Sequence, residues 1–236
     1  MNCGCKFSPG KQVAGLPEQL KPRFLSGLPK ADLDSLLSVA KHRQFRTSSV
    51  VIYEGDPGDR FFLLTSGQGR QFVTTNKGKK VLVYWLTAGQ AFGGVAILSA
   101  RINYLASTQV LPDSCVLMWD RQTIRELVSR CPQLLDNALS IAATEHVVWS
   151  ITTQVSLTCD DARGRIAHLL ASLACGIGKA TPDGVELKIT NEDLAAGANV
   201  TSFTASRILN EWQRAGVLTK DRGKVLLRKP FLMLSC

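Results

Sequence analysis

The side chains in this sequence that could do chemistry gather near its carboxyl end, in a short run of hydroxyl, aromatic and guanidinium groups. They are Thr201, Ser202, Phe203, Thr204, Ser206 and Arg207. The planar guanidinium of Arg207 could bond O6 and N7 of one guanine together, which is the commonest specific contact between proteins and DNA. Ser206 could reach a base edge, and Phe203 could pack on a thymine methyl. Thr201 and Thr204 suit contacts with phosphates, so the run predicts a surface that reads double-stranded DNA.

Residue patterns for other chemistries are missing. Of the three histidines only His42 falls in the first 145 residues, so an enzyme built around clustered metal ligands is not expected. The sequence also lacks the Gly-x-Ser-x-Gly of a serine nucleophile and the Gly-Lys-Ser/Thr of a phosphate loop. We therefore expect neither catalysis nor a metal site.

Two short helices joined by a tight turn must hold this run of side chains. The first helix begins at Thr190, which forms a capping-box pattern with Asp193 three residues later. After a four-residue turn, either Thr201 or Ser202 caps a second helix over residues 203–215. In such a pair the second helix enters the major groove by its N-terminus, so residues near its start reach base edges.

A hairpin with a basic tip follows the helix pair. Residues 217–227 indicate two strands around Asp221-Arg222-Gly223-Lys224. From Arg207 onward the chain has seven basic and two acidic residues, and its formal net charge is +9, which favours nucleic acid as a partner. The helix pair and this wing predict a winged helix-turn-helix. The alternative is a helical hairpin in a domain core, with Arg207 on a solvated face.

A strand-rich stretch lies in the first half of the chain, after a loose arm (residues 1–15) and short helices (residues 16–45, broken at Pro29). β-Branched and aromatic runs alternate there with turn clusters rich in glycine, asparagine and aspartate. The runs are residues 50–53, 61–65, 69–74, 80–86 and 110–120. Short strands at such intervals predict an antiparallel roll or barrel.

Residues 81–100 carry no charge and have the length of a membrane span. Glycines near the middle, including Gly93 and Gly94, follow β-branched and aromatic residues, which predicts a strand, a turn and a second element instead. No apolar signal segment precedes the seven scattered cysteines. We therefore expect a cytoplasmic protein with most thiols reduced and no membrane partner.

From Arg121 onward the spacing of apolar residues becomes helical, with a long candidate helix over residues 132–158. Apolar residues recur in it every seven positions, at Leu134, Ile141, Val148 and Val155. This spacing is expected where two helices pack along a seam, so it favours a helix that pairs two copies of the chain. The alternative is a helix lying on its own domain. A further capped helix is predicted over residues 162–175.

Several segments, in the right order along residues 20–230, resemble the CRP/FNR family of bacterial transcription regulators. In the first half these are Gly55–Asp59 followed by Phe61–Leu64 and Ser66-Gly67, and then Ala88–Gly94. In the second half they are Asp161–Ala167 and the helix pair from Ile189 to Leu209. The combination is specific although each segment is modest, and it covers nearly the whole chain.

The resemblance implies an α+β protein with three parts. Residues 1–131 would hold the arm, the short helices and an antiparallel β-roll of the cyclic-nucleotide-binding (jelly-roll) type. Residues 132–159 would form a long dimerisation helix, and residues 160–236 a winged helix-turn-helix domain. The resemblance further implies a homodimer on near-palindromic double-stranded DNA, an effector in the roll, and RNA polymerase as a partner.

The family's base-reading positions fall on four residues of the predicted second helix. These are Ser202, Phe203, Ser206 and Arg207. Ser206 and Arg207 match the family pattern. Ser202 and Phe203 replace the Arg and Glu commonly found there, which leaves the half-site sequence open.

The resemblance also locates an effector site, at Gly93, Gly94, Arg101, Asn103, Tyr104 and Ser150. Members that bind cyclic AMP carry a Glu for the ribose and an Arg-Ser or Arg-Thr pair for the phosphate. Here Gly94 stands in place of the Glu, and Asn103-Tyr104-Leu105 replaces the pair, with Arg101 two positions away. Of the two helix positions that would touch the base, only Ser150 fits. We expect that cyclic AMP does not bind tightly, and the effector stays unidentified.

Two other sensing chemistries and one other function remain as alternatives. Cys3, Cys5 and Cys115 supply at most three thiolates at the wrong spacing for an iron–sulfur cluster, although a redox disulfide in the arm stays open. A haem would need an axial ligand, and only His146 lies on the long helix near the roll. A ligand-binding roll that acts on a protein partner would lack the helix pair with its basic wing.

Overall fold

The computed structural model describes residues 16–17, 19–158 and 161–228. The described chain divides into two compact units. The first reaches to Val73 and resumes over Tyr84–His146, whereas the second holds Thr74–Val83 and the chain from Val147 onward. Each unit is built around its own buried apolar residues, and the two are described separately below.

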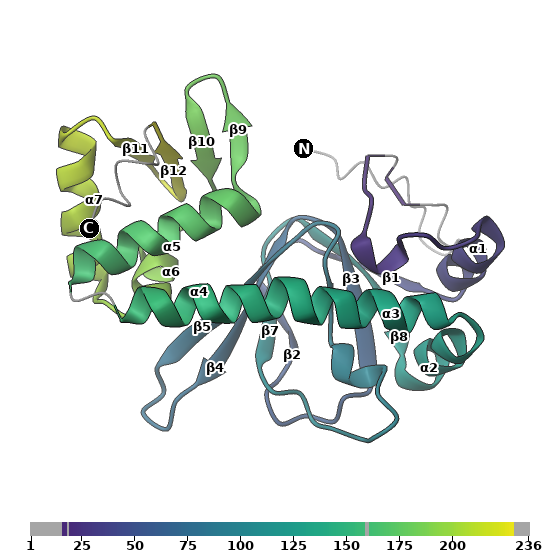
Figure 1. The fold of residues 1–236 in the computed structure, drawn as a ribbon. Coiled ribbons are helices and arrows are strands. Elements are labelled where there is room, and N and C mark those ends of the chain that lie inside the picture. The colour runs from purple at the N-terminus through teal and green to yellow at the C-terminus, as the bar shows by residue number, and fades with distance from the viewer. Residues whose placement is uncertain (1–15, 18, 159–160, 229–236) are drawn as a thin grey trace. The chain divides into compact units, whose positions relative to one another are not determined.

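A roll of short antiparallel strands lies mainly in the first unit, which confirms the predicted architecture (Figure 1). One sheet has the order β1-β8-β3-β6 and the other the order β2-β7-β4-β5. The strands are β1 (Lys41–Phe45), β2 (Ser49–Ile52), β3 (Arg60–Ser66), β4 (Gln68–Thr74), β5 (Lys80–Thr87), β6 (Ala91–Phe92), β7 (Ser107–Val110) and β8 (Ser114–Asp120). Consecutive strands that change sheets in this way give a closed double layer with short edges.

Two stretches of the roll differ from the sequence prediction. Residues 41–45 were expected at the end of a helical segment, but they form β1, which pairs antiparallel with β8 in a register that places Lys41 opposite Met118. The sheet partner outweighs local helical spacing there. The expected run 110–120 is interrupted by a turn at Asp113, whose φ of 60° is left-handed. Val110 consequently ends β7 and residues 114–120 form β8, and these two strands belong to different sheets.

Helices cover one face of the β1-β8-β3-β6 sheet. They are the 3₁₀ turn η1 (Arg23–Leu25), α1 (Lys30–Ser38), α2 (Arg121–Arg130) and α3 (Pro132–Ile141), whose first residue is a proline suited to a helix start. The core between them includes Phe24, Leu36, Phe61, Leu117, Trp119, Ile124 and Leu134. The indole Nε1 of Trp119 donates to the carbonyl of Leu36 at 2.9 Å, so this buried polar group is satisfied.

The long helix runs through three segments. After α3 comes a π-helical segment (Ala142–His146), followed by α4 (Val147–Leu157). Such wide turns usually reflect one extra residue in a helix and are frequent at functional sites. No helix among the described residues is long and apolar enough to cross a membrane.

The seven-residue repeat on this helix does not define one exposed face, which corrects the sequence interpretation. Leu134 and Ile141 are 2% and 8% exposed and belong to the core of the roll. Val155 is 54% exposed, and the side chain of Val148 lies outside the described set. Leu134 and Ile141 thus pack on the roll, and the pairing of two copies by this helix stays a prediction.

The second unit contains the predicted helix-turn-helix and wing. Helix α5 (Ala162–Ile177) begins where the Asp161 carboxylate accepts from the Gly164 amide at 2.6 Å. Helix α6 (Asn191–Gly197) precedes α7 (Ser202–Arg214). A four-stranded sheet of order β11-β12-β10-β9 completes the unit, with β9 (Lys179–Thr181), β10 (Gly184–Leu187), β11 (Leu218–Asp221) and β12 (Lys224–Leu227). β11 and β12 form the predicted hairpin.

Candidate nucleic-acid interface and effector pocket

The two short helices are capped as the sequence predicts. Thr190 accepts from the Asp193 amide while the Asp193 carboxylate accepts from the Thr190 amide, which is a complete capping box. Thr201 caps α7 by accepting from the Thr204 amide at 3.1 Å. The turn between the helices passes through Asn199 at a φ of 51°, a left-handed conformation that asparagine tolerates. These local bonds fix where α7 starts.

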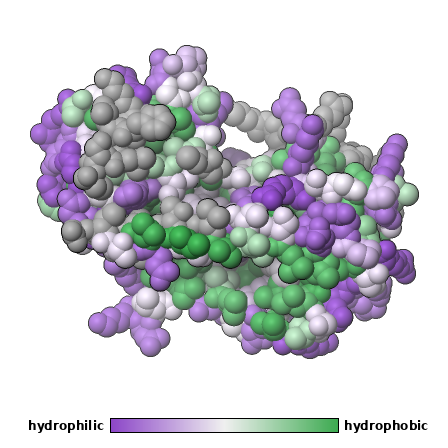
Figure 2. All heavy atoms as spheres, viewed as in Figure 1, coloured by the Kyte–Doolittle hydropathy of each residue, from purple (hydrophilic) through white to green (hydrophobic). Residues whose placement is uncertain are grey.

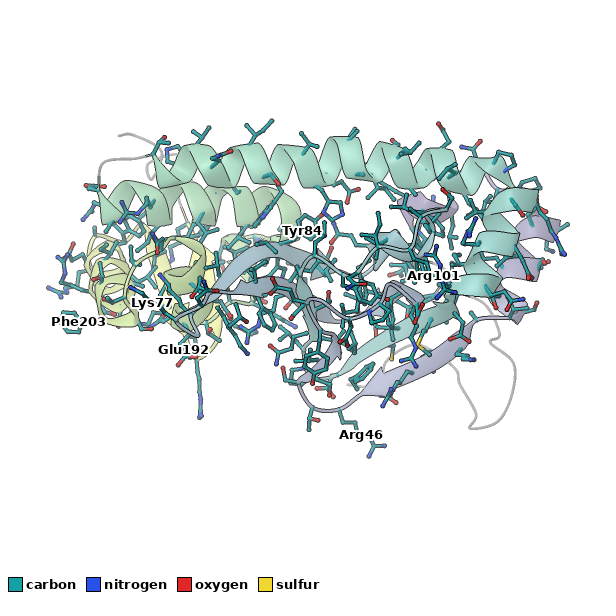
Figure 3. The ribbon with its side chains drawn as sticks, turned by 90° about the horizontal axis from the view of Figure 1, so that it is seen from below. Arg46, Lys77, Tyr84, Arg101, Glu192 and Phe203 are labelled. Atoms are coloured by element: carbon teal, nitrogen blue, oxygen red, sulfur yellow. The ribbon has the colours of Figure 1, made fainter. Side chains whose placement is uncertain are left out.

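Helix α7 has one buried and one exposed face. The buried face is apolar and holds Ala205, Ile208, Leu209 and Trp212. The exposed face starts with Ser202 and Phe203, and the Phe203 ring is 79% exposed and projects outward from the helix (Figure 3). Ser206 is half-buried and Arg207 exposed on the next turn of the same face. These four side chains are therefore accessible together at the start of α7.

Arg207 is held in place by an acidic neighbour one helical turn away. Its Nη1 lies 2.8 Å from Oε1 of Glu211, and the other carboxylate oxygen of Glu211 lies 3.0 Å from Nη1 of Arg163. The Arg163 guanidinium in turn lies over the Trp212 ring, 5.2 Å from its centroid. Exposed pairs of this kind contribute about 0–1 kcal/mol, so breaking the pair with Glu211 costs little when Arg207 turns to another acceptor. The ion pair with Glu211 orients Arg207 and leaves its guanidinium available for another acceptor.

The wing presents basic groups beside the helix pair. Lys220 Nζ donates to the Asn210 side chain at 3.2 Å, which ties β11 to α7. Lys224 Nζ lies 3.5 Å from the Glu186 carboxylate, and Arg222 is exposed at the hairpin tip. A hollow between the tip and the start of α6 is lined by these three basic residues, by Thr190 and Asn191, and by the acidic residues Glu192 and Asp221. The basic and hydroxyl groups among them suit contacts with a phosphate backbone.

The roll contains a cavity of about 390 Å³. Its walls come from strands of both sheets, from the segment after β6, and from the inner side of α3 and the π segment. Three phenylalanines line it (Phe24, Phe61 and Phe92), and each is at most 3% exposed. Its volume falls in the range of about 300–1,000 Å³ that small-molecule sites occupy.

Three of the six predicted effector residues line this cavity. They are Gly93, Gly94 and Tyr104. Gly93 has a left-handed φ of 76°, and a Cβ there would lie 2.7 Å from the Arg60 carbonyl, so the position requires glycine. At Gly94 an added Cβ would meet no heavy atom within 4 Å. The Tyr104 hydroxyl donates to the Arg60 carbonyl at 2.7 Å and accepts from its amide at 2.9 Å.

The other three predicted effector residues lie elsewhere. Arg101 lines a separate, more polar hollow beside Asp59 and Arg121 (Figure 3 shows its position). Asn103 pairs with Pro57 in an isolated bridge and is absent from the cavity wall. Ser150 is on α4, in the second unit. Cys3 and Cys5, the candidate redox residues, lie outside the described residues.

Sequence reasoning missed the helix residues that line the cavity. They are Ala138, Ile141, Ala142 and His146. Their spacing of three to four residues marks one side of a helix, but that signal does not distinguish a cavity wall from a filled core. His146 was singled out only as a potential haem ligand. Its ring lies 4.4 Å from the Tyr84 ring, and burial lowers its pKa although Glu145 opposes the shift.

A polar cluster holds the π segment against the roll. Glu145 accepts from Arg23 at 2.8 Å with one oxygen, and from Gln90 at 3.1 Å and Tyr84 at 3.4 Å with the other. Figure 3 shows Tyr84 on its strand beneath the helix. Burial raises the pKa of Tyr84, so the phenol stays protonated and donates to the carboxylate. These bonds fix the wall that carries Ala142 and His146.

Arg121 organises the opposite wall. This buried guanidinium donates to the carbonyls of five residues between Val95 and Ala100, at 2.7–3.2 Å. The arginine thereby holds the segment that follows Gly94, and both of its terminal nitrogens are engaged by the backbone. Among the described residues, no cluster of three His, Cys, Asp or Glu side chains could hold a metal ion.

Two family models match the sequence, one in the first half of the chain and one in the second. The model of the cyclic nucleotide-binding domain matches residues 42–131, and the model of the Crp-like helix-turn-helix domain matches residues 164–232. The first covers the roll with α2, and the second covers α5 through the wing. Their order along the chain is that of a sensor followed by a DNA-binding domain.

Curated relatives match over most of their length. The "Cyclic AMP receptor protein" of Thermus thermophilus is 27% identical over 208 residues, which cover 88% of this chain and 93% of the relative. The "Anaerobic regulatory protein" of Bacillus subtilis is 24% identical over 216 residues, covering 86% and 87%.

Solved structures share the fold. FixK2 from Bradyrhizobium japonicum superposes with a TM-score of 0.71 at 17% identity, covering 83% of this chain and 96% of that one. The c-di-GMP responsive global regulator CLP of Xanthomonas campestris gives a TM-score of 0.71 at 16% identity, covering 84% and 99%. At such identities the likeness establishes the architecture alone.

Proposed function

The chain belongs to the CRP/FNR family of DNA-binding transcription regulators, and from this premise we propose how it works. It acts as a homodimer whose two α7 helices read a near-palindromic site on double-stranded DNA, under the control of a small molecule bound in the roll. Residues 1–131 sense the effector, residues 132–159 pair the two copies, and residues 160–236 bind DNA. The observation that carries the proposal is the capped, exposed start of α7 beside a basic wing.

Base reading rests on Ser206 and Arg207, with Ser202 and Phe203 on the same exposed face. The Glu211 carboxylate keeps the Arg207 guanidinium extended along the helix surface, so little side-chain entropy is lost when it reaches a guanine. Phe203 offers an apolar contact with a thymine methyl. Thr201 and Thr204, which share a hydrogen bond of 2.8 Å at the helix start, lie where phosphates are contacted.

Dimerisation rests on apolar residues that the long helix leaves exposed. On α4 they recur every four positions, at Val147, Ile151 and Val155, and each is 50–57% exposed. A self-complementary stripe of this kind on one helix suits a two-fold interface, in which the same residues of both copies meet. This stripe replaces the seven-residue repeat as the proposed seam.

The effector differs from cyclic AMP in this proposal. The Glu position is Gly94, the Arg101 side chain lines another hollow, and the terminal nitrogens of Arg121 are engaged by carbonyls. The relatives' names point to more than one signal, since they include a cyclic AMP receptor and a c-di-GMP responsive regulator. RNA polymerase is the further partner, because a transcription regulator acts by recruiting or blocking it, and the cytoplasm is the place of action.

Selection of bound duplexes from a random pool, followed by gel shifts at two salt concentrations, tests the proposal. We expect enrichment of a near-palindrome whose half-sites lie about one helical turn apart. Affinity for the selected site is expected to exceed that for random duplex by about a thousandfold or more at the same salt concentration. Binding that rises at low salt but never selects a sequence would instead favour a roll that acts on a protein partner.

A further inference from the structure

The walls of the cavity in the roll disfavour a charged ligand. Its lining contains no Asp, Glu, Lys or Arg among the described residues. Polar side chains on the wall already have hydrogen-bond partners within the protein. Tyr104 is bonded twice to the backbone of Arg60, and the Gln71 amide donates to the Thr108 hydroxyl at 3.3 Å. An anion that entered this cavity would lose its water without gaining a counter-charge, which is strongly unfavourable.

Small residues keep the cavity open. Glycine or alanine occupies six lining positions, at Ala91, Gly93, Gly94, Ala106, Ala138 and Ala142. Larger side chains at these positions would fill the space, as they do in the core next to it. Rings of Phe24, Phe61 and Phe92 supply flat apolar walls, which suit a compact hydrophobic ligand.

The mouth of the cavity is also apolar. Leu105, a lining residue, is 77% exposed. Figure 2 shows hydrophobic residues gathered over the roll below the long helix. An exposed leucine beside an open apolar cavity gains contact area when a ligand covers it. The single titratable imidazole on the wall, His146, is mainly neutral at pH 7 because burial lowers its pKa.

We propose that this cavity binds a neutral, mainly apolar small molecule with at most a few hydrogen-bonding groups and no phosphate. The inference rests on the proposed function, in which the cavity is the effector site, and it names the class of the effector. The ligand lies between the three phenylalanine rings and the helix wall at Ala138 and Ala142, and its polar group faces Thr108 or His146.

A matched pair of fluorescent probes tests the inference. N-Phenyl-1-naphthylamine is neutral, and 1-anilinonaphthalene-8-sulfonate is the same framework with one sulfonate. We expect the neutral probe to bind the full-length protein in the micromolar range and the sulfonate about tenfold or more weakly, because the anion is left unpaired. Cyclic AMP at similar concentrations should not displace the neutral probe. Equal binding of both probes, no binding of the neutral one, or displacement by micromolar cyclic AMP would overturn the proposal.

Variants locate the probe. Ala142→Trp and Gly94→Trp each add a large side chain to the lining of the cavity, and an added Cβ at Gly94 meets no neighbour. Each should weaken binding of the neutral probe about tenfold or more, whereas Ala100→Trp, an exposed alanine outside the lining, should leave it unchanged. Thermal melting checks the folding of each variant. Unchanged binding in folded Ala142→Trp or Gly94→Trp protein would place the probe elsewhere and refute the assignment.

The same protein preparation is used for selection from the random DNA pool. A protein that selects a DNA sequence but binds no neutral probe refutes the ligand class alone. A protein that binds the probe in the cavity but never selects a sequence refutes the DNA-reading proposal instead.

Discussion

Arg207 is the side chain on which sequence reading depends most directly. Arg207→Ala should reduce discrimination between the selected site and a site altered at one guanine by about 1–3 kcal/mol, because one bidentate base contact is lost. Arg214→Ala, an exposed arginine at the other end of α7, is the matched control and should retain the discrimination. Gel-shift competition measures both. Equal loss in the two variants would mean that Arg207 acts only through its charge.

Arg121 differs from Arg207, since it is buried and stabilises the fold by bonding backbone carbonyls instead of contacting a ligand. Arg121→Ala should lower the free energy of unfolding by about 2–4 kcal/mol, because it leaves buried carbonyls between Val95 and Ala100 without a donor. Arg125→Ala, an exposed position on the same helix, should change it by less than about 0.5 kcal/mol. Urea denaturation gives both values. Arg121→Lys should not restore the loss, since an ammonium group has fewer donors in a different geometry. Full rescue by lysine would show that only the charge matters.

At the scale of elements, the exposed stripe on the long helix is the feature to test. Val155→Glu should shift the protein from dimer to monomer, because it places two carboxylates across a two-fold seam. Val39→Glu, at a valine of similar exposure outside the helix (46% against 54%), should leave the dimer intact. Sedimentation velocity distinguishes the two states. A dimer that survives Val155→Glu would require another interface.

The elements that local chemistry specifies were predictable from the sequence. The caps at Thr190 and Thr201, the wing hairpin and most strands of the roll agree with expectation, because each depends on residues within a few positions of one another. Elements set by distant partners were not. Residues 41–45 became a strand through pairing with β8, and Leu134 and Ile141 turned inward because the roll offers them a core.

The candidate sites divide in the same way. The reading face of α7 was predicted from one run of residues, since a helix places its neighbours by a fixed rule. The cavity wall was predicted only at Gly93, Gly94 and Tyr104. The helix residues Ala142 and His146 reach it through a packing arrangement and a π segment, and neither has a signature in one sequence.

At the scale of the whole molecule, buried histidines tie stability to pH. Burial lowers the pKa of His42 and of His146 below the usual 6.5, so the unfolded chain binds more protons than the folded one at mildly acid pH. Stability should therefore be full above about pH 7.5 and fall as the pH drops through about 6.5. Thermal melting between these pH values and pH 5.5 measures the decline.

His146→Gln should make that decline shallower, because the glutamine takes up no proton while it keeps a polar group beside Tyr84. His168→Gln, at a histidine outside the cavity, provides the comparison. A decline that is unchanged in His146→Gln would assign the acid sensitivity to other groups.

The empty surroundings of Gly94 have an evolutionary consequence. Codons for glycine and glutamate can differ by one base, and a side chain at this position displaces nothing. A single base change could therefore place a carboxylate on the wall of the cavity without disturbing the packing of the roll. The signal that this protein answers can thus change while its fold stays the same.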